Sequence, residues 1–130
     1  MSIEREYIYQ AKVLKVVDGD TVDLKVLLLN ATDLGFGIKS QPMTVNYRFR
    51  LYGIDAPETR TLDMAEKKEG IAAKKYLAEL LETSQGHVTI KTYKDKHDSF
   101  GRYLVTLYNV NGLNLNLEML NTGHAEEYRR

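Results

Sequence analysis

The chain has no cysteine and no tryptophan, only two prolines, and no excess of either charge. Without cysteine there are no disulfides, no thiolate nucleophile and no cysteine-based zinc site, so the core alone must hold the fold. No uninterrupted apolar run is long enough to cross a bilayer, which excludes a transmembrane helix. The first six residues lack the apolar stretch of a signal peptide. We therefore expect a cytoplasmic location for the chain as written, and a secreted one if a leader was removed.

The balance of charge limits how the chain could hold a polyanion. Lysine and arginine number 18, aspartate and glutamate also 18, and the formal net charge is +0. Proteins that hold nucleic acid on a broad basic face carry a clear excess of lysine and arginine. Any polyanion must here be held by a few placed cations or a metal ion, because the overall field does not gather it.

The 130 residues are 43% hydrophobic and 28% charged, which is typical of one globular domain spanning 1–130. Alternating apolar residues predict strands over 7–17, 21–29 and 43–52, with an irregular loop over 30–42 and a short loop over 53–63. Further strands are expected over 88–93 and 103–110, flanking a polar loop over 94–102, and a short helix over 113–121. The main helix ends before Gly86, and its apolar stripe consists of Ala73, Tyr76, Leu77, Leu80 and Leu81.

This order of elements predicts a mixed α and β fold. Five strands, with a helix between the third and the fourth, fit a small five-stranded OB-fold barrel with two to three helices. The face of such a barrel often binds oligonucleotides.

Asp20 is the first residue that the fold alone does not explain. It has the same parity as Val22, Leu24 and Val26, so its carboxylate should lie on the apolar side of the strand. A carboxylate there needs a partner cation or several hydrogen bonds to stay ionised. The alternative is that residues 18–20, Asp-Gly-Asp, are merely a turn.

A second cluster lies where the third predicted strand meets the following loop. Asp55 and Glu58 are three residues apart on a loop that Pro57 stiffens, and Arg50 lies at the end of the strand. Taken singly, each is commonly a solubilising, capping or surface residue. All three within nine residues of one junction favour a functional site.

A third cluster precedes the last predicted strand. Gly101 permits a tight backbone there and Arg102 opens the strand. A lone arginine in this place is more often a solvated charge than a ligand. The three histidines, His87, His97 and His124, lack metal-ligand spacing.

Together the three clusters resemble the staphylococcal (micrococcal) nuclease family. Three motifs carry the resemblance in the family's order: residues 17–22 (VDGDTV), 49–59 (FRLYGIDAPET) and 98–102 (DSFGR). Residues 117–125 also resemble the family's last helix. The likeness runs from about Val13 to Tyr128.

The resemblance implies a calcium-dependent nuclease that hydrolyses phosphodiester bonds of DNA and RNA at the 5′ P–O bond, leaving 3′-phosphate ends. It implies Asp20, Asp55 and the backbone carbonyl of Ala56 as Ca²⁺ ligands. It also implies Glu58 as general base, and Arg50 and Arg102 as phosphate-binding arginines. The reaction itself also requires such groups, because phosphodiester hydrolysis builds negative charge that a hard cation and planar guanidinium groups stabilise.

Two positions depart from the family pattern beside the substrate. Ser99 and Phe100 replace a lysine and a tyrosine, so one phosphate contact is expected to be lost while aromatic character remains. Tyr128 stands near the place where the family has tyrosines that stack on a base. The expected substrate-binding set is therefore Arg50, Arg102, Phe100 and Tyr128, with single-stranded or frayed DNA and RNA as partners, no membrane partner, and a monomeric state.

Two other interpretations stay open at this point. A non-catalytic, nuclease-like OB-fold module would bind single-stranded nucleic acid without cutting it. A purely structural barrel would carry its acidic mouth incidentally. The retention of both metal-type carboxylates and both arginines favours the enzyme over either of them.

Overall fold

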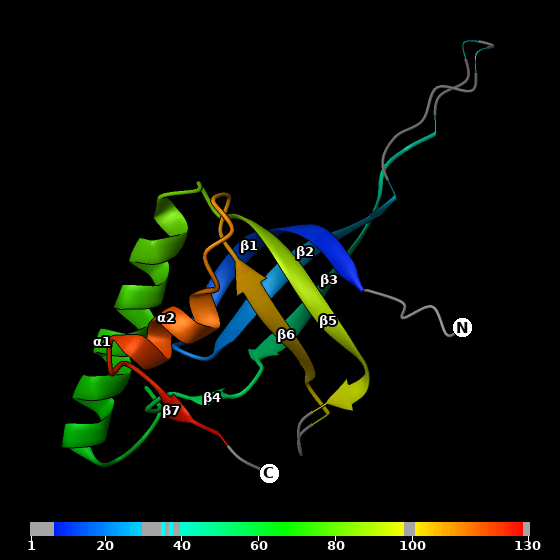
Figure 1. Cartoon of the computed structure of the whole chain (residues 1–130). Coiled ribbons are helices and arrows are strands. Elements are labelled where there is room, and N and C mark those ends of the chain that lie inside the picture. The colour runs from blue at the N-terminus through cyan, green and yellow to red at the C-terminus, as the bar shows by residue number, and fades with distance from the viewer. Residues whose placement is uncertain (1–6, 30–34, 36, 38–39, 98–100, 129–130) are drawn as a thin grey trace, which may run out of the picture.

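The computed structural model describes residues 7–29, 35, 37, 40–97 and 101–128, and of residues 94–97 the backbone alone. Its centre is a closed five-stranded barrel in the order β1-β2-β3-β6-β5 (Figure 1). The barrel strands are β1 (Ile8–Asp18), β2 (Thr21–Leu29), β3 (Met43–Leu51), β5 (His87–His97) and β6 (Tyr103–Tyr108). Two helices, α1 (Met64–Glu82) and α2 (Leu115–Asn121), lie beside the barrel. The predicted mixed fold with a five-stranded barrel is confirmed.

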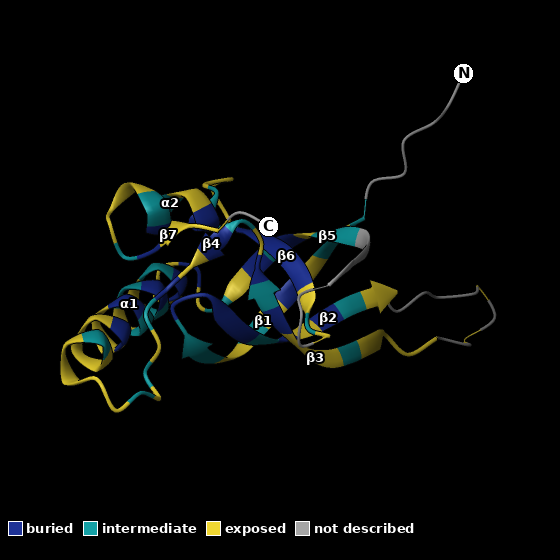
Figure 2. Cartoon of the chain, turned by 90° about the horizontal axis from the view of Figure 1, so that it is seen from below, coloured by how far each residue is buried: buried dark blue, intermediate teal, exposed yellow. Residues whose placement is uncertain are grey.

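The barrel closes through one parallel contact. All neighbouring strands pair antiparallel except β3 and β6, which run parallel and pair only through residues 49–51 and 103–105. Beyond that contact, β2 and β3 leave the barrel as a two-stranded ribbon (Figures 1 and 2). The parallel contact therefore places Arg50 where the barrel closes.

The barrel interior is filled by the alternating residues that the sequence pattern indicates. Val22 and Leu24 of β2 are fully buried, Val26 is nearly so, and the buried residues line the barrel and the face of α1 turned toward it (Figure 2). Thr21 has the parity of the polar face of β2, with Asp23 and Lys25, but it is buried. The reason is local, because its hydroxyl donates to the Asp20 carboxylate.

Helix α1 packs on the end of the barrel through very small residues. It begins at Met64 because the Asp63 side chain accepts hydrogen bonds from the amides of the first turn. The predicted stripe is confirmed, with Ala73, Leu77 and Leu81 buried. A Cβ on Gly19 would lie 2.8 Å from the Ala73 Cβ, so only glycine lets the helix approach the turn between β1 and β2 so closely.

Several predicted boundaries are wrong. Strand β5 continues to His97, so the polar loop predicted from residue 94 is partly strand, and β6 ends at Tyr108 rather than at residue 110. Two short strands were missed: β4 (Ile54–Asp55), inside the predicted 53–63 loop, and its partner β7 (Glu126–Glu127). A two-residue strand has no periodicity to detect, and only its distant partner defines it.

The predicted 30–42 loop falls largely outside the described residues. Of the helices that the structure describes, none has the length and apolar character to cross a membrane.

Candidate active site

Asp20 lies on the apolar side of the chain, as its parity predicts, and is only 4% exposed. Its Oδ1 accepts a hydrogen bond from the Thr21 hydroxyl at 2.8 Å, and its Oδ2 accepts one from the Ala56 amide at 2.9 Å. Oδ2 also lies 3.4 Å from Nη2 of Arg50. The buried carboxylate thus has both the hydrogen bonds and the cation that burial demands.

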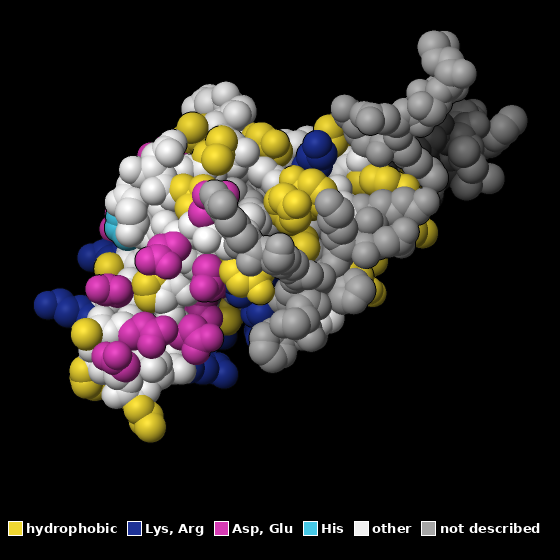
Figure 3. Space-filling view, turned by 60° about the horizontal axis from the view of Figure 1, so that its bottom comes forward, with side chains coloured by type: hydrophobic (Ala, Val, Ile, Leu, Met, Phe, Trp, Pro, Cys, Tyr) yellow, Lys and Arg dark blue, Asp and Glu magenta, His cyan; other side chains and the backbone are white. Residues whose placement is uncertain are grey.

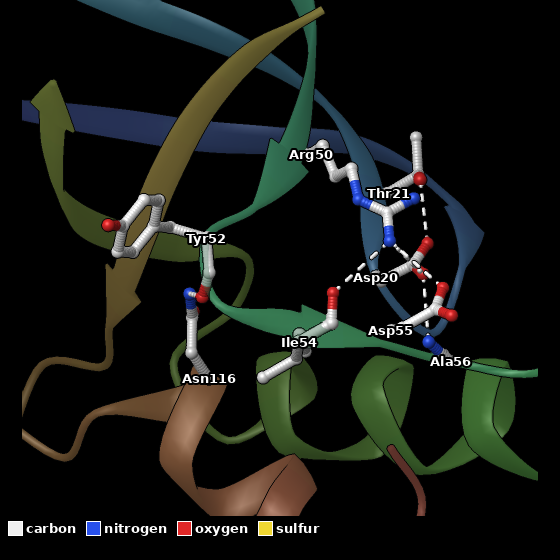
Figure 4. A network of polar contacts seen from close by, with 8 residues as sticks. All are labelled: Asp20, Thr21, Arg50, Tyr52, Ile54, Asp55, Ala56 and Asn116. Atoms are coloured by element: carbon white, nitrogen blue, oxygen red, sulfur yellow. Dashed lines mark hydrogen bonds and ion pairs between the residues drawn. The ribbon is translucent and has the colours of Figure 1, made fainter. Parts of the chain in front are cut away.

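Arg50 joins the two halves of the site. Its Nη2 lies 2.9 Å from Oδ1 of Asp55 and donates to the Ile54 carbonyl at 3.2 Å (Figure 4). The same nitrogen therefore contacts two carboxylates and one carbonyl oxygen. The short strand β4 makes this possible, because it carries Ile54 and Asp55 back toward the end of β3.

The two carboxylates fit a hard divalent cation in donor type and direction. Asp20 and Asp55, thirty-five positions apart in sequence, point at one positively charged nitrogen, and calcium takes carboxylate and carbonyl oxygens as ligands. No cluster of three Asp, Glu or His side chains suited to a metal forms among the described residues, so further ligands would be backbone oxygens and water. Ala56 contacts Asp20 through its amide, so it lies next to the two carboxylates.

Glu58 lies on the exposed part of a loop that is held at both ends. Asp20 accepts from the Ala56 amide on one side, and on the other the Asp18 carboxylate accepts from the Thr59 hydroxyl at 2.7 Å. Between them the backbone rests on α1, where a Cβ on Gly70 would lie 2.5 Å from the Glu58 carbonyl oxygen. The loop that carries Glu58 is thus fixed against the same turn that carries Asp20.

The remaining predicted site residues are Tyr128, Arg102 and Phe100. The Tyr128 ring lies 5.2 Å from the Arg50 guanidinium carbon, within the range of a cation–π contact, and its amide donates to the Gly53 carbonyl. Arg102 is half-buried immediately before Tyr103, the register partner of Phe49 in β3. Phe100 lies outside the described residues.

Negative charge surrounds the site. Figure 3 shows acidic side chains gathered on the part of the molecule formed by α1 and the β4–β7 sheet. The exposed or half-buried acidic residues of these elements and the loop between them include Asp55, Glu58, Glu66, Glu126 and Glu127. A phosphate approaching from this side meets a repulsive field unless a cation offsets it.

Comparison with known proteins gives the family of the chain. Residues 48–130, which contain Arg50, Asp55, Glu58 and Arg102, match the profile of the family described as staphylococcal nuclease homologues. The chain belongs to the staphylococcal nuclease family. The family match covers the strand, loop and helices around the site, and the turn with Asp20 precedes it.

Matches to individual relatives cover more of the chain. It is 31% identical over 125 residues to Endonuclease YhcR of Bacillus subtilis, across 92% of this chain. It is 35% identical over 107 residues to a rice (Oryza sativa) protein named "Probable staphylococcal-like nuclease CAN2", across 79% of this chain. An uncharacterised protein of Methanocaldococcus jannaschii is 31% identical over 139 residues. The aligned segments make up only 9%, 26% and 59% of these three relatives.

Sequence reasoning missed the residues that hold this staphylococcal nuclease-type site together. Asn116 of α2 is buried, and its amide nitrogen donates to the carbonyls of Tyr52 and Val105 while its oxygen accepts from the Leu107 amide. Gly70 was also missed, although a glycine in mid-helix is costly and so signals a close backbone approach. Asn116 gives no such signal, because its partners are backbone atoms from distant segments.

Proposed function

We propose that the chain is a calcium-dependent nuclease that hydrolyses phosphodiester bonds of DNA and RNA, cleaving the 5′ P–O bond and leaving 3′-phosphate ends. Membership of the staphylococcal nuclease family supports a nuclease. The observation that carries the proposal is the convergence of Asp20 and Asp55 on one nitrogen of Arg50.

Asp20, Asp55 and the Ala56 carbonyl would hold the calcium ion. A bound ion would offset the negative charge of the phosphate and the charge that develops on the leaving oxygen. Two carboxylates contact one guanidinium here, so these three groups together carry a net negative charge that favours a cation.

Arg50 and Arg102 bind the phosphate. A guanidinium presents a planar fork of donors that matches two phosphate oxygens, and it stays charged at any physiological pH. Arg50 is well placed for this role, because β3, the Ile54 carbonyl and the Tyr128 ring all restrict its side chain. Its side chain is 13% exposed, so its charge is only partly screened by water.

Glu58 acts as general base on the attacking water. A base must be held within hydrogen-bonding reach of the proton that it takes, and the clamped 56–59 backbone supplies that positioning. Its exposed side chain can reach water without a change in the loop. No serine, cysteine or histidine nucleophile is required by this scheme.

The test is cleavage of single-stranded DNA and RNA by the pure protein with added calcium and with a chelator. We expect cleavage with calcium only, 3′-phosphate ends, and a loss of about 10²- to 10⁴-fold in rate for Glu58→Ala. Glu69→Ala, on an exposed position of α1, is the matched control and should cleave like the wild type.

A folded protein that binds the strands but cleaves neither with calcium would overturn this proposal in favour of a non-catalytic binding module. Equal cleavage in chelator would overturn the calcium requirement alone.

A further inference from the structure

Two tyrosines form a stacked pair beside the candidate active site. The rings of Tyr52, which follows β3, and Tyr93 of β5 lie 4.3 Å apart between centroids with an interplanar angle of 23°. Tyr52 remains 39% exposed, although it is among the largest apolar side chains of the domain. The proposed chemistry at Arg50, Glu58 and the carboxylates leaves this pair without a role.

The stack is held rigidly. The Tyr52 amide donates to the Val105 carbonyl at 2.8 Å, and its carbonyl accepts from the Asn116 side chain at 3.0 Å (Figure 4). The Tyr93 hydroxyl shares a 2.7 Å hydrogen bond with Thr106. Because both backbone groups of Tyr52 and the hydroxyl of Tyr93 are fixed, little conformational entropy is lost when a flat ligand stacks on the pair.

Tyr52 has the same parity as Arg50, although the Tyr52 ring and the Arg50 guanidinium extend in different directions (Figure 4). Side chains two residues apart on a strand share a face and are separated by about 7 Å along it. Tyr52 stands two residues beyond Arg50, and the chain has just left the strand. The ammonium group of Lys91 lies 5.8 Å from the centre of the Tyr93 ring, which adds a positive charge near the stack.

We propose that Tyr52, backed by Tyr93, is a stacking platform for an unpaired nucleobase of the strand whose phosphate is held at Arg50. This inference rests on the proposed function and adds the form of the substrate to it. Bases in a duplex have their faces covered by neighbouring base pairs, whereas bases of a single strand can turn out and stack on aromatic rings. The platform therefore selects single-stranded nucleic acid with little dependence on sequence, because every base has a π-face.

A second aromatic cluster offers a matched control. Tyr47 and Tyr103 are 53% and 54% exposed, with their rings 5.9 Å apart at 84° over the buried Phe49. Their parity on β3 and β6 is that of the barrel interior, opposite to Arg50. A T-shaped pair on that side has the same chemistry and greater exposure, but it does not share the face that holds the phosphate.

The test is binding of a labelled oligothymidylate, measured by fluorescence anisotropy in chelator at low ionic strength, so that no cleavage occurs. The comparison strand is an abasic deoxyribose phosphate of equal length, which has the same charge and no bases. We expect the wild type to bind the thymidylate about five- to a hundredfold more tightly, as one aromatic–base stack implies. Tyr52→Leu should remove this preference, Tyr52→Trp should keep it, and Tyr47→Leu should leave it unchanged.

Three results would overturn the inference: no preference in the wild type, a preference retained by Tyr52→Leu, or an equal loss in Tyr47→Leu. Tyr93→Ala gives a second route if Tyr52→Leu does not fold, since it removes the backing ring and should weaken the preference. Binding of duplex DNA should be the same in the wild type and in Tyr52→Leu.

The abasic strand separates this inference from the proposed function. Its cleavage with calcium involves no nucleobase, so it tests the phosphodiesterase activity without the platform. If no phosphodiester is hydrolysed, the proposed function fails, while the preference for bases in chelator still decides whether the platform exists.

Discussion

Strands β2 and β3 and the segments next to them carry two aspartate–arginine contacts that differ in almost every physical respect. Asp23 and Arg48 are direct register partners, and Arg48 donates to both carboxylate oxygens, from Nε at 2.8 Å and Nη2 at 3.2 Å. Their side chains are 26% and 51% exposed. Asp20 and Arg50 meet at 3.4 Å with side chains 6% and 13% exposed, and the same arginine nitrogen also contacts Asp55.

The difference supports the proposal that one contact is structural and the other functional. The exposed pair is balanced, one carboxylate to one guanidinium in a bidentate geometry. The second contact is unbalanced, because the Arg50 nitrogen that meets the buried Asp20 carboxylate also contacts Asp55, whose side chain is 55% exposed. Two carboxylates around one guanidinium leave a net negative charge, which suits a divalent cation.

The largest expected effect contrasts the two arginines. Arg50→Ala should lower kcat/KM for calcium-dependent cleavage of single-stranded DNA by about 10³- to 10⁵-fold, because a phosphate-binding guanidinium is lost. Arg48→Ala, two residues away, should stay within about threefold of the wild type, since it loses only a screened surface pair. Steady-state kinetics on the two folded variants measures the contrast, and a similar loss in both would remove the distinction.

The next effect contrasts the two aspartates. Calcium at about a hundred times its Kd should stabilise the wild type by about 2.7 kcal/mol through mass action, seen as a rise in Tm. Asp20→Asn should lose this response because one ligand is gone, and Asp23→Asn should keep it. Thermal melts with calcium and with chelator test this, and a calcium response surviving in Asp20→Asn would argue against that ligand.

A third prediction concerns the packing that holds the Glu58 loop. Alanine for glycine normally stabilises a helix by about 1 kcal/mol. At Gly70 the new Cβ would meet the carbonyls of Glu58 and Pro57, at 2.5 and 2.9 Å, so we expect Gly70→Ala to destabilise the domain by about 1–3 kcal/mol.

The displaced loop should also lower kcat more than it changes KM. The control is Ala72→Gly, at an exposed position of the same helix, which should cost about 1 kcal/mol and leave kcat unchanged. A more stable Gly70→Ala variant with wild-type kcat would contradict the contact.

The smallest effect is the pH dependence of the exposed pair. The hydrogen bond from Arg48 lowers the pKa of Asp23 below its ordinary value of 3.8, partly opposed by desolvation. A carboxyl whose pKa is lower in the folded state adds stability above pH 3.8, and this is lost as the pH falls through the folded pKa. The Tm of Asp23→Asn should therefore lie a few degrees at most below that of the wild type at neutral pH. Melts below pH 3.8 should show the difference shrinking, and a constant difference would exclude this pair as its cause.

The long, periodic elements were predictable because each carries its own signal. The strand over residues 21–29 and the stripe of α1 appear where the spacing places them, and the parity of Asp20 correctly indicates a buried carboxylate that needs partners. The predictions failed for elements whose bounds depend on pairing with residues far away in the sequence. Strands β4 and β7 are two residues long, and neither exists without the other.

The sequence by itself determined the closed barrel, the helical face and the family to which the chain belongs, because hydrophobic periodicity and local motifs are properties of neighbouring residues. Only the tertiary structure decided that Asp20 and Asp55 point at one nitrogen of Arg50, that α1 rests on the Glu58 backbone, and that Tyr52 stacks on Tyr93. These contacts join residues far apart in the chain. Their distances depend on how the barrel closes and how closely the helix packs, which no local pattern encodes.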